Sequence, residues 1–358
     1  MSSRLSKAKE RISNNNDMSS SVLVIYTGGT IGMKEDPQDG TLKPFDFSQI
    51  KEEVPELNKF KVKLDSYTFS PLIDSSDVEP ALWVNLAELI HERYEDYDGF
   101  VILHGTDTMA YSASALSFML EGLSKPVIFT GSQLPIGVPR TDGKENLIAA
   151  VEIASAKKAD GSAQVPEVAI FFDSRLLRGN RSTKYSAEAF NAFASPNLPP
   201  LAQAGINIRY NNDIIRKPKG GVLKVHSHLD CRVSILKIHP GITPAVARHS
   251  LCAPEIRACI LETYGSGNAI SKDWFLNIIK EADHLGKILL NVTQCKSGTV
   301  NMNLYATGAT LKSCGVISGE DITTEAALGK LFCLMGLTDN NEWVKAMLEK
   351  DLCGEITA

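Results

Sequence analysis

The sequence predicts an α/β protein in which parallel strands alternate with helices, and three observations support this prediction. Short, continuous apolar runs bounded by glycine recur along the chain, as expected for parallel strands buried on both faces. Stretches with apolar residues at helical spacing separate these runs, which indicates βαβ units. At 358 residues and 43% hydrophobic composition, the chain can bury a full core and is long enough for two domains.

Strands and helices alternate in both halves of the chain. The expected strands are 21–26, 99–103, 126–131 and 168–173 in the first half, and 233–238, 258–262 and 288–292 in the second. The expected helices are 109–120, 146–156, 245–251 and 274–285, followed by a helical segment over 324–352. The polar stretch between the halves carries Lys217-Pro218-Lys219-Gly220-Gly221 and is typical of a linker. We therefore expect a flexible leader (1–21), an N-terminal domain (22–210), a linker (211–231) and a C-terminal domain (232–358).

Composition excludes several classes of protein. The net charge of −5 is small and spread along the chain, whereas a nucleic-acid binder needs a basic face. No apolar run approaches the roughly 20 residues of a membrane span, and the polar stretch 1–20 has no apolar core of a signal peptide. The seven cysteines are odd in number and widely spaced, unlike a disulfide framework or a zinc site. We expect a cytoplasmic enzyme that binds neither nucleic acid nor membrane and holds no metal.

Two threonine-bearing turns follow predicted strands. One is Thr27-Gly28-Gly29-Thr30-Ile31-Gly32, and the other is His104-Gly105-Thr106-Asp107-Thr108. Because ligands of open α/β sheets bind beyond the carboxyl ends of the strands, we expect both turns to face one pocket. A threonine hydroxyl becomes a nucleophile when a base takes its proton, and neighbouring glycines expose amide donors for an oxyanion. Thr30 suits the nucleophile, while Thr106 and Asp107 add a second hydroxyl and a carboxylate that can bind an amine.

Two further segments are expected at the same crevice. The segment 178–184 follows the strand that ends at Asp173, so it should reach the carboxyl edge of the sheet. Burial disfavours the charged form of lysine, so Lys184 could act there as a base. Asp74-Ser75-Ser76-Asp77 adds hydroxyls suited to binding a carboxylate.

Each of these residues also has a purely structural interpretation. A Gly-Gly-Thr turn after a strand is often only a tight turn whose threonine caps a helix, as Thr30 could. Asp107 could cap the helix that begins near Met109, and Lys184 could be one solvated cation among 37 basic residues. The functional interpretation therefore depends on the combination of motifs rather than on any one of them.

In combination, the motifs resemble the bacterial-type L-asparaginase family, in the right order from about Val22 to the C-terminus. The segments that carry this resemblance are 27–32, 104–109, 130–133 and 178–184, and 193–200 with 305–308 bring it closest to the cytosolic type I branch. The resemblance implies a larger N-terminal parallel-sheet α/β domain, a smaller C-terminal α/β domain, and homotetramers built as dimers of dimers with sites at the dimer interface. It implies hydrolysis of L-asparagine to L-aspartate and ammonia through a threonine-linked acyl-enzyme, without metal or organic cofactor, and with glutamine as a candidate second substrate.

The resemblance also implies a role for each site residue. Thr30 matches the primary nucleophile, and Lys184 matches a proton acceptor or relay for Thr106, which activates water or assists the attack. Asp107 binds the α-amine of the substrate and Ser75 its α-carboxylate, while the amides of Thr30 and Thr106 form the oxyanion hole. The remaining members of the expected substrate-binding set are Gly29, Asp74, Ser76 and, from a neighbouring subunit, Asn268.

The chain departs from the family pattern at two places. Many members carry a tyrosine in the lid after the first motif, whereas segment 34–47 has none. Tyr305 could supply that hydroxyl, or it could be a core tyrosine near a turn. Some type I enzymes bind asparagine at an effector site through an arginine, at a position where this chain has Glu262. Because an acid there would repel the carboxylate of asparagine, we expect weak or absent allostery of that kind.

Other functions fit the sequence less well. A broader amidase that also uses glutamine would need extra room near Ser76, and an enzyme of tRNA amidation would need an RNA-binding extension. A nucleotide-binding dehydrogenase would use Gly28-Gly29-Thr30-Ile31-Gly32, but the spacing is not GxGxxG and no clear acid ends a second strand. A scaffold protein would leave the second threonine motif without a purpose. A metal hydrolase would have to use His226 and His228, which have no accompanying carboxylate–histidine helix pair.

Overall fold

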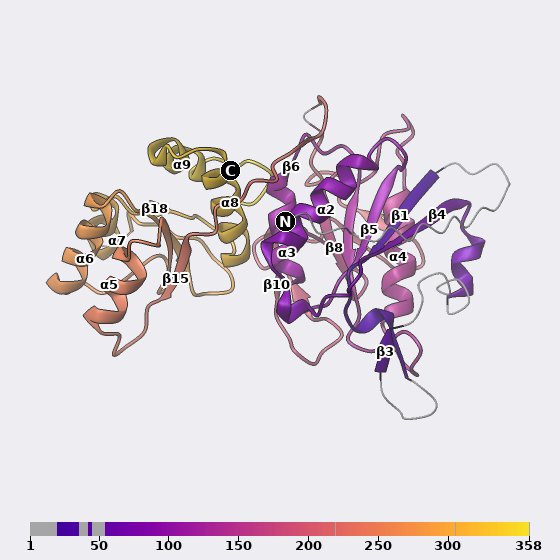
Figure 1. Cartoon of the computed structure of the whole chain (residues 1–358), viewed down its shortest axis with the longest axis horizontal. Coiled ribbons are helices and arrows are strands. Elements are labelled where there is room, and N and C mark those ends of the chain that lie inside the picture. The colour runs from indigo at the N-terminus through magenta and orange to yellow at the C-terminus, as the bar shows by residue number, and fades with distance from the viewer. Residues whose placement is uncertain (1–19, 36–41, 45–53, 219, 305, 358) are drawn as a thin grey trace. The chain divides into compact units, whose positions relative to one another are not determined.

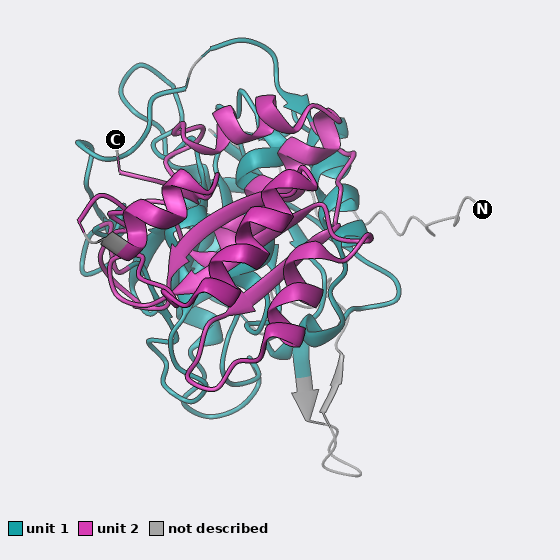
Figure 2. Cartoon of the chain, turned by 90° about the vertical axis from the view of Figure 1, so that its left-hand side faces the viewer, with its two compact units in different colours: residues 1–195, 199–225 teal, residues 196–198, 226–358 magenta. Residues whose placement is uncertain are grey.

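The computed structural model describes residues 20–35, 42–44, 54–218, 220–304 and 306–357 and divides the chain into two compact units (Figure 1). Unit 1 comprises residues 1–195 and 199–225, and unit 2 comprises 196–198 and 226–358, as the two colours of Figure 2 show. The chain leaves unit 1 after Val225, because β14 (Lys224–Val225) pairs with β6 (Leu120–Glu121) of that unit. Much of the stretch expected as a linker (211–231) therefore belongs to unit 1, and the stretch expected as a leader ends in strand residues from Ser20 onward.

Unit 1 contains an eight-stranded sheet in the order β13-β12-β9-β8-β7-β5-β1-β4. Its parallel strands are β1 (Ser20–Tyr26), β4 (Val62–Thr68), β5 (Gly99–Leu103), β7 (Val127–Thr130) and β8 (Val168–Phe172). Every residue of β5, β7 and β8 is buried, so the prediction from continuous apolar runs is confirmed.

Three strands of this sheet run antiparallel to their neighbours, although the sequence predicts a parallel sheet. They are β9 (Arg175–Arg178), β12 (Ala202–Gln203) and β13 (Arg209–Tyr210). The reversal happens at Asp173 and Ser174, whose φ angles of 48° and 61° form a two-residue hairpin turn between β8 and β9. Positive φ at both central residues matches the twist of hairpin strands, which explains why the chain folds back instead of crossing over.

Helices cover the sheet of unit 1. They are α2 (Pro80–Glu92), α3 (Met109–Met119) and α4 (Gly143–Ser155). The core cluster joins Leu147, Ala150 and Val151 of α4 to alternate residues of the parallel strands, such as Val24 and Val101. Figure 1 shows α3 on the opposite side of these strands from α4, so the parallel strands are buried on both faces.

Unit 2 is a smaller α/β unit with a parallel sheet in the order β15-β16-β17-β18. Its strands are β15 (Val233–Lys237), β16 (Ala258–Thr263), β17 (Ile288–Thr293) and β18 (Ile317–Ser318), and its helices are α5 (Pro244–Cys252), α6 (Asp273–His284), α7 (Ala306–Ser313), α8 (Thr324–Leu337) and α9 (Asn341–Leu348). The expected helical segment 324–352 is two helices, because Thr338 is extended and Asn340 begins a new helix by accepting a hydrogen bond from the amide of Trp343 at 3.1 Å.

Short elements complete the structure. They are η1 (Thr30–Gly32), β2 (Met33–Glu35), β3 (Leu42–Pro44), η3 (Pro55–Lys59), η4 (Ser75–Asp77), η5 (Gly179–Arg181), β10 (Thr183–Lys184) and β11 (Phe193–Ala194). Across the described ranges, none of the helices combines the length and the apolar composition needed to cross a membrane.

Candidate active site

The two threonine motifs and the turn after β7 meet at one edge of the unit 1 sheet. The parallel register pairs Tyr26 with Leu103, and Leu103 with Thr130, so the three strands end side by side. Backbone hydrogen bonds continue beyond these ends: the amide of Thr27 donates to Leu103 at 3.0 Å, and that of His104 donates to Thr130 at 3.0 Å. The turns that follow β1, β5 and β7 therefore adjoin, as expected for the ligand-binding edge of a parallel sheet.

Glycine allows the first two turns to touch. A Cβ atom on Gly29 would lie 2.6 Å from the Cα and N atoms of Gly105, and one on Gly105 would lie 2.5 Å from the Oγ of Ser75. Gly29 also has φ 91° and ψ 169°, a conformation that is essentially restricted to glycine. Thr30 and Thr106 directly follow these two glycines, so the close backbone approach brings the turns that carry both hydroxyls together.

Thr30 begins the short helix η1 without capping it. The N-cap is Gly29 and no side chain caps this turn, so the cap interpretation of Thr30 does not hold. Thr30 is partly exposed, and its hydroxyl has no hydrogen-bond partner within the described ranges.

Lys184 lies between the hydroxyl and the carboxylate of the second motif. Its Nζ donates to Thr106 Oγ1 at 2.8 Å and to Asp107 Oδ1 at 2.7 Å. The side chain of Lys184 is 20% exposed, so it is not a freely solvated cation, whereas that of Asp107 is 61% exposed and open to a further cationic partner. Helix α3 is preceded by Thr108 as its N-cap and has no side-chain cap, so Asp107 is not a helix cap either.

The route by which Lys184 reaches this position differs from the expected one. The segment 178–184 was expected to reach the crevice because it follows the strand that ends at Asp173, but β9 first carries the chain back so that Arg178 pairs with Ala169. The chain then passes beside α3, where Ser114 Oγ donates to the carbonyl of Gly179 at 3.4 Å. From there it continues to β10, which places Lys184 beside the residues that precede α3.

Ser75 contacts the second motif from the segment after β4. Its Oγ lies 3.4 Å from both Asp107 Oδ2 and the Asp107 amide, and its carbonyl accepts a 2.7 Å hydrogen bond from Thr108 Oγ1. Asp74 accepts hydrogen bonds from the amide and hydroxyl of Ser76 at 2.9 and 2.8 Å, and these bonds lower the pKa of Asp74. Asp74 and Ser76 thus form the turn that presents Ser75. Sequence reasoning gave no role to Thr108, whose hydroxyl joins the two segments.

A buried histidine supports the same turn, and sequence reasoning missed it. Trp83 Nε1 donates to Ser112 Oγ at 2.9 Å, Ser112 Oγ lies 2.9 Å from His104 Nε2, and His104 Nδ1 lies 2.7 Å from the carbonyl of Gly105. Because the Gly105 carbonyl can only accept, Nδ1 of the neutral ring carries the proton and donates to it. Nε2 then accepts from the hydroxyl of Ser112, which itself accepts from the indole. Burial lowers the pKa of His104 to about 4, so the imidazole is neutral near pH 7. The sequence feature that could have revealed this network is His104 itself, which stands directly before Gly-Thr-Asp at the end of a buried strand.

Other predicted residues lie in unit 2 or outside the described ranges. Asn268 accepts a 2.7 Å hydrogen bond from Thr307 Oγ1. Glu262 accepts one from Thr324 Oγ1 at 2.7 Å and lies 3.9 Å from Lys237 Nζ. Tyr305 lies outside the described residues. Within those ranges, no group of three histidine, cysteine or acidic side chains could hold a metal ion.

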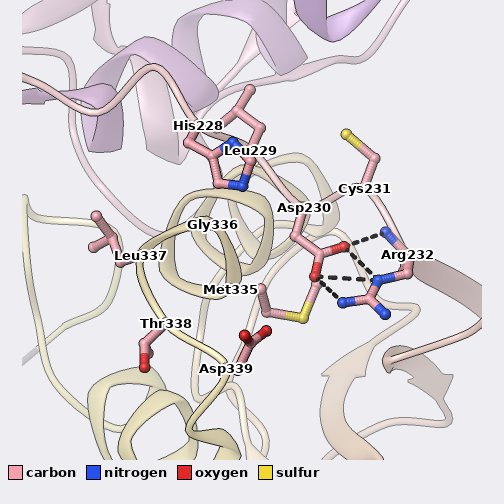
Figure 3. A pocket seen from close by; sticks show the side chains of 10 residues that line it. All are labelled: His228, Leu229, Asp230, Cys231, Arg232, Met335, Gly336, Leu337, Thr338 and Asp339. Atoms are coloured by element: carbon pink, nitrogen blue, oxygen red, sulfur yellow. Dashed lines mark hydrogen bonds and ion pairs between the residues drawn. The ribbon is translucent and has the colours of Figure 1, made fainter.

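Unit 2 also has a pocket of about 450 Å³, lined by residues 228–232 and 335–339 (Figure 3). Its central acid, Asp230, is bonded to Arg232 at 2.7 Å and to Arg257 at 3.0 Å. The guanidinium of Arg232, with that of Arg257, holds the pKa of Asp230 far below its usual range. None of the residues predicted for the active site lines this pocket, so the candidate active site is the threonine cluster of unit 1.

Both units match known protein families. The family model for the N-terminal domain of asparaginase matches residues 21–216, and the model for the glutaminase/asparaginase C-terminal domain matches residues 232–348. Among curated proteins, L-asparaginase 1 of Escherichia coli strain K12 is 46% identical over 342 residues, which cover 94% of this chain and 98% of that protein. The human 60 kDa lysophospholipase is 42% identical over 359 residues, which cover 94% of this chain and 61% of that protein.

A solved structure agrees with these matches. The crystal structure of L-asparaginase I from Vibrio cholerae has a TM-score of 0.85 and 43% sequence identity, and the match covers 95% of this chain and 99% of that one. The matches in sequence and in fold extend over the threonine cluster and over both units. The chain belongs to the asparaginase family.

Proposed function

We propose that the protein is an L-asparaginase, which hydrolyses L-asparagine to L-aspartate and ammonia through a threonine-linked acyl-enzyme and without a cofactor. One observation carries this proposal: Lys184 Nζ lies 2.8 Å from Thr106 Oγ1 and 2.7 Å from Asp107 Oδ1, in the turn that touches Gly29. The hydroxyl of Thr106, the amine of Lys184 and the carboxylate of Asp107 thus lie beside the turn that carries Thr30. The similarity to enzymes named L-asparaginase supports the choice of substrate.

The charges of the cluster suit the two charges on the Cα of asparagine. Asp107 binds the α-ammonium through Oδ2, since Lys184 engages Oδ1. Ser75 donates to the α-carboxylate; its 3.4 Å contacts with Asp107 are long for hydrogen bonds and are readily exchanged for substrate contacts. Holding both ends of the substrate orients its side-chain amide toward Thr30 before attack.

The chemistry proceeds in two steps. Thr30 Oγ1 attacks the side-chain amide carbon, and the amides of Thr30 and Thr106 stabilise the oxyanion. The carbon–nitrogen bond then breaks, the nitrogen leaves as ammonia with the proton from Thr30, and a β-acyl ester remains. In the second step water adds to the ester carbon while Thr106 accepts its proton and relays its own to Lys184. The bond between that carbon and Thr30 Oγ1 then breaks, and the proton returns through Lys184 and Thr106 to Thr30 Oγ1 as aspartate is released. Tyr305 remains the candidate that orients Thr30.

We also propose the assembly and compartment of the enzyme. Asn268 contributes to the site of a neighbouring subunit, within a homotetramer built as a dimer of dimers. Glutamine is a slower second substrate. None of the seven cysteines, all of which lie in the described ranges, forms a disulfide, which supports a reducing compartment such as the cytoplasm.

Ammonia release from asparagine and glutamine, measured from micromolar to tens of millimolar substrate, tests the proposed function. We expect release from asparagine, and a loss on the order of 10³-fold or more in turnover for Thr30→Ala, because the covalent path disappears. Thr30→Ser keeps the hydroxyl and should retain activity. Thr299→Ala changes an exposed threonine of unit 2 and serves as the matched control. Wild-type turnover by Thr30→Ala, or no release from asparagine by the unmodified enzyme, would overturn the assignment.

A further inference from the structure

The residues that directly follow Lys184 form a hairpin loop, residues 185–192, and most of this loop is exposed. The flanking strands β10 and β11 are short and pair only Thr183 with Ala194 and Lys184 with Phe193. The loop is closed by its own backbone, since the amides of Tyr185 and Ser186 both donate to the carbonyl of Ala192. Strands of two residues are too short to hold such a loop rigidly by themselves. An additional constraint on the loop would therefore also constrain Lys184 at its start.

Gln133 provides that constraint from a different part of unit 1. Its side-chain Nε2 donates to the carbonyls of Ala187 at 3.2 Å and of Ala189 at 3.1 Å. Both partners are acceptors, so the amide nitrogen rather than the oxygen must face the loop. Gln133 lies in the turn after β7, where its own amide donates to both oxygens of the Asp142 carboxylate at 3.1 and 3.0 Å. A side chain anchored at the sheet edge thus uses both of its donors on one loop.

We propose that Gln133 is a positioning residue that keeps Lys184 within hydrogen-bond distance of Thr106. This inference rests on the proposed function, because it concerns the proton that passes between Thr106 and Lys184. Without the two contacts, the loop and the end of β10 gain conformational freedom, and the amine spends less time at the 2.8 Å distance recorded for the pair. Asp107 and Ser75, which bind the substrate, belong to other segments. The expected effect therefore falls on kcat much more than on KM.

Two substitutions of Gln133 distinguish the effect of its hydrogen-bond donors from the effect of its side-chain shape. Gln133→Met keeps the length of the side chain and removes both donors. Gln133→Glu also keeps the shape but turns a carboxylate toward two carbonyls, so it should be at least as harmful. Gln164→Met is the matched control, because the side-chain amide of Gln164 donates to Asn212 Oδ1, at 2.7 Å, on an exposed surface of unit 1. We expect kcat for asparagine to fall about 10- to 100-fold for Gln133→Met, with KM changed less than about threefold, and neither to change for Gln164→Met.

Hydrogen exchange of the amides in residues 185–192 tests the same contact without a substrate. We expect faster exchange in Gln133→Met than in the unmodified protein or in Gln164→Met, at an unchanged temperature of global unfolding. Unchanged exchange would overturn the contact, and faster exchange with unchanged kcat would overturn its link to Lys184. If the unmodified enzyme releases no ammonia from asparagine, the proposed function fails instead and the positioning role with it, while the exchange result still decides whether Gln133 holds the loop.

Discussion

A buried ion pair in unit 2 allows a quantitative prediction about stability. Lys330 lies within α8 and Glu355 lies near the C-terminus; both side chains are 0% exposed, and Nζ is 2.7 Å from Oε1. Lys330 also donates to the carbonyls of Leu348 and Lys350 at 2.9 and 2.6 Å. The pair therefore joins α8 to the residues after α9, and Lys330→Met removes the cation while preserving the length of the side chain.

The expected cost follows from what the substitution leaves behind. Glu355 keeps hydrogen bonds from the amides of Leu352 and Cys353, at 2.8–3.1 Å, but loses the positive charge of Lys330 while remaining fully buried. Breaking a buried pair in this way costs about 3–5 kcal/mol, mainly because one charge remains uncompensated. For a unit of this size we expect the unfolding temperature to fall by roughly 10 °C.

Thermal unfolding, followed by circular dichroism or calorimetry at pH 7, provides the assay. The double variant Lys330→Met/Glu355→Gln removes both charges and should recover part of the loss. Lys345→Met is the matched control, because its partners Glu342, at 3.0 Å, and Asp283, at 3.6 Å, are 82% and 42% exposed, and pairs with exposed acids contribute about 1 kcal/mol or less. A stabilising role of the buried pair is refuted if Lys330→Met is no more destabilising than Lys345→Met, or if the double variant is less stable than the single one.

Four further predictions concern the active site and its regulation. Asp107→Asn should lower kcat/KM about 100-fold, mainly through KM, because the substrate ammonium loses its counter-charge; unchanged KM would contradict the binding role. Gly29→Ala should lower kcat about 100-fold, since its Cβ would lie 2.6 Å from Gly105 and push the two turns apart; kinetics at the level of the parent enzyme would argue against their contact. The pKa of His104 is about 4 in the folded protein and 6.5 in the unfolded chain, so the unfolded chain binds the extra proton between these values. The neutral, buried imidazole therefore contributes its full stability above pH 6.5, and about 3 kcal/mol of the free energy of unfolding is lost as the pH falls toward 4. The unfolding temperature of His104→Gln should depend less steeply on pH than that of the unmodified protein, and an equally steep dependence would disprove the assignment. Saturation by asparagine should be hyperbolic, and a sigmoidal curve that Glu262→Ala abolishes would show that effector binding survives.

Sequence alone was enough for the strands that are buried on both faces. The run 99–103 was predicted with the bounds that the structure has, because a strand covered on both sides must be apolar at every residue. Strand β4 (Val62–Thr68) was missed, since it is the edge strand and most of its residues are only partly buried. The end of α8 was also missed, although the polar run 338–342 follows it; the backbone is extended at Thr338, and Asn340 in that run caps the next helix.

The candidate site shows the same division between local pattern and long-range contact. The two threonine turns could be placed at one edge from sequence, since parallel strands end at the same side of a sheet. Lys184 was also expected at this edge, but its route there could not be predicted, because it depends on the antiparallel β9 and on the passage beside α3. Likewise, the contact of Gln133 with the loop joins residues 54 and 56 positions apart. Periodicity and composition report the burial of each segment, so the sequence by itself determined the strands that are buried on both faces, the two threonine turns and the family. Which side chains meet depends on strand direction and on backbone contacts between distant segments, and only the tertiary structure decided those.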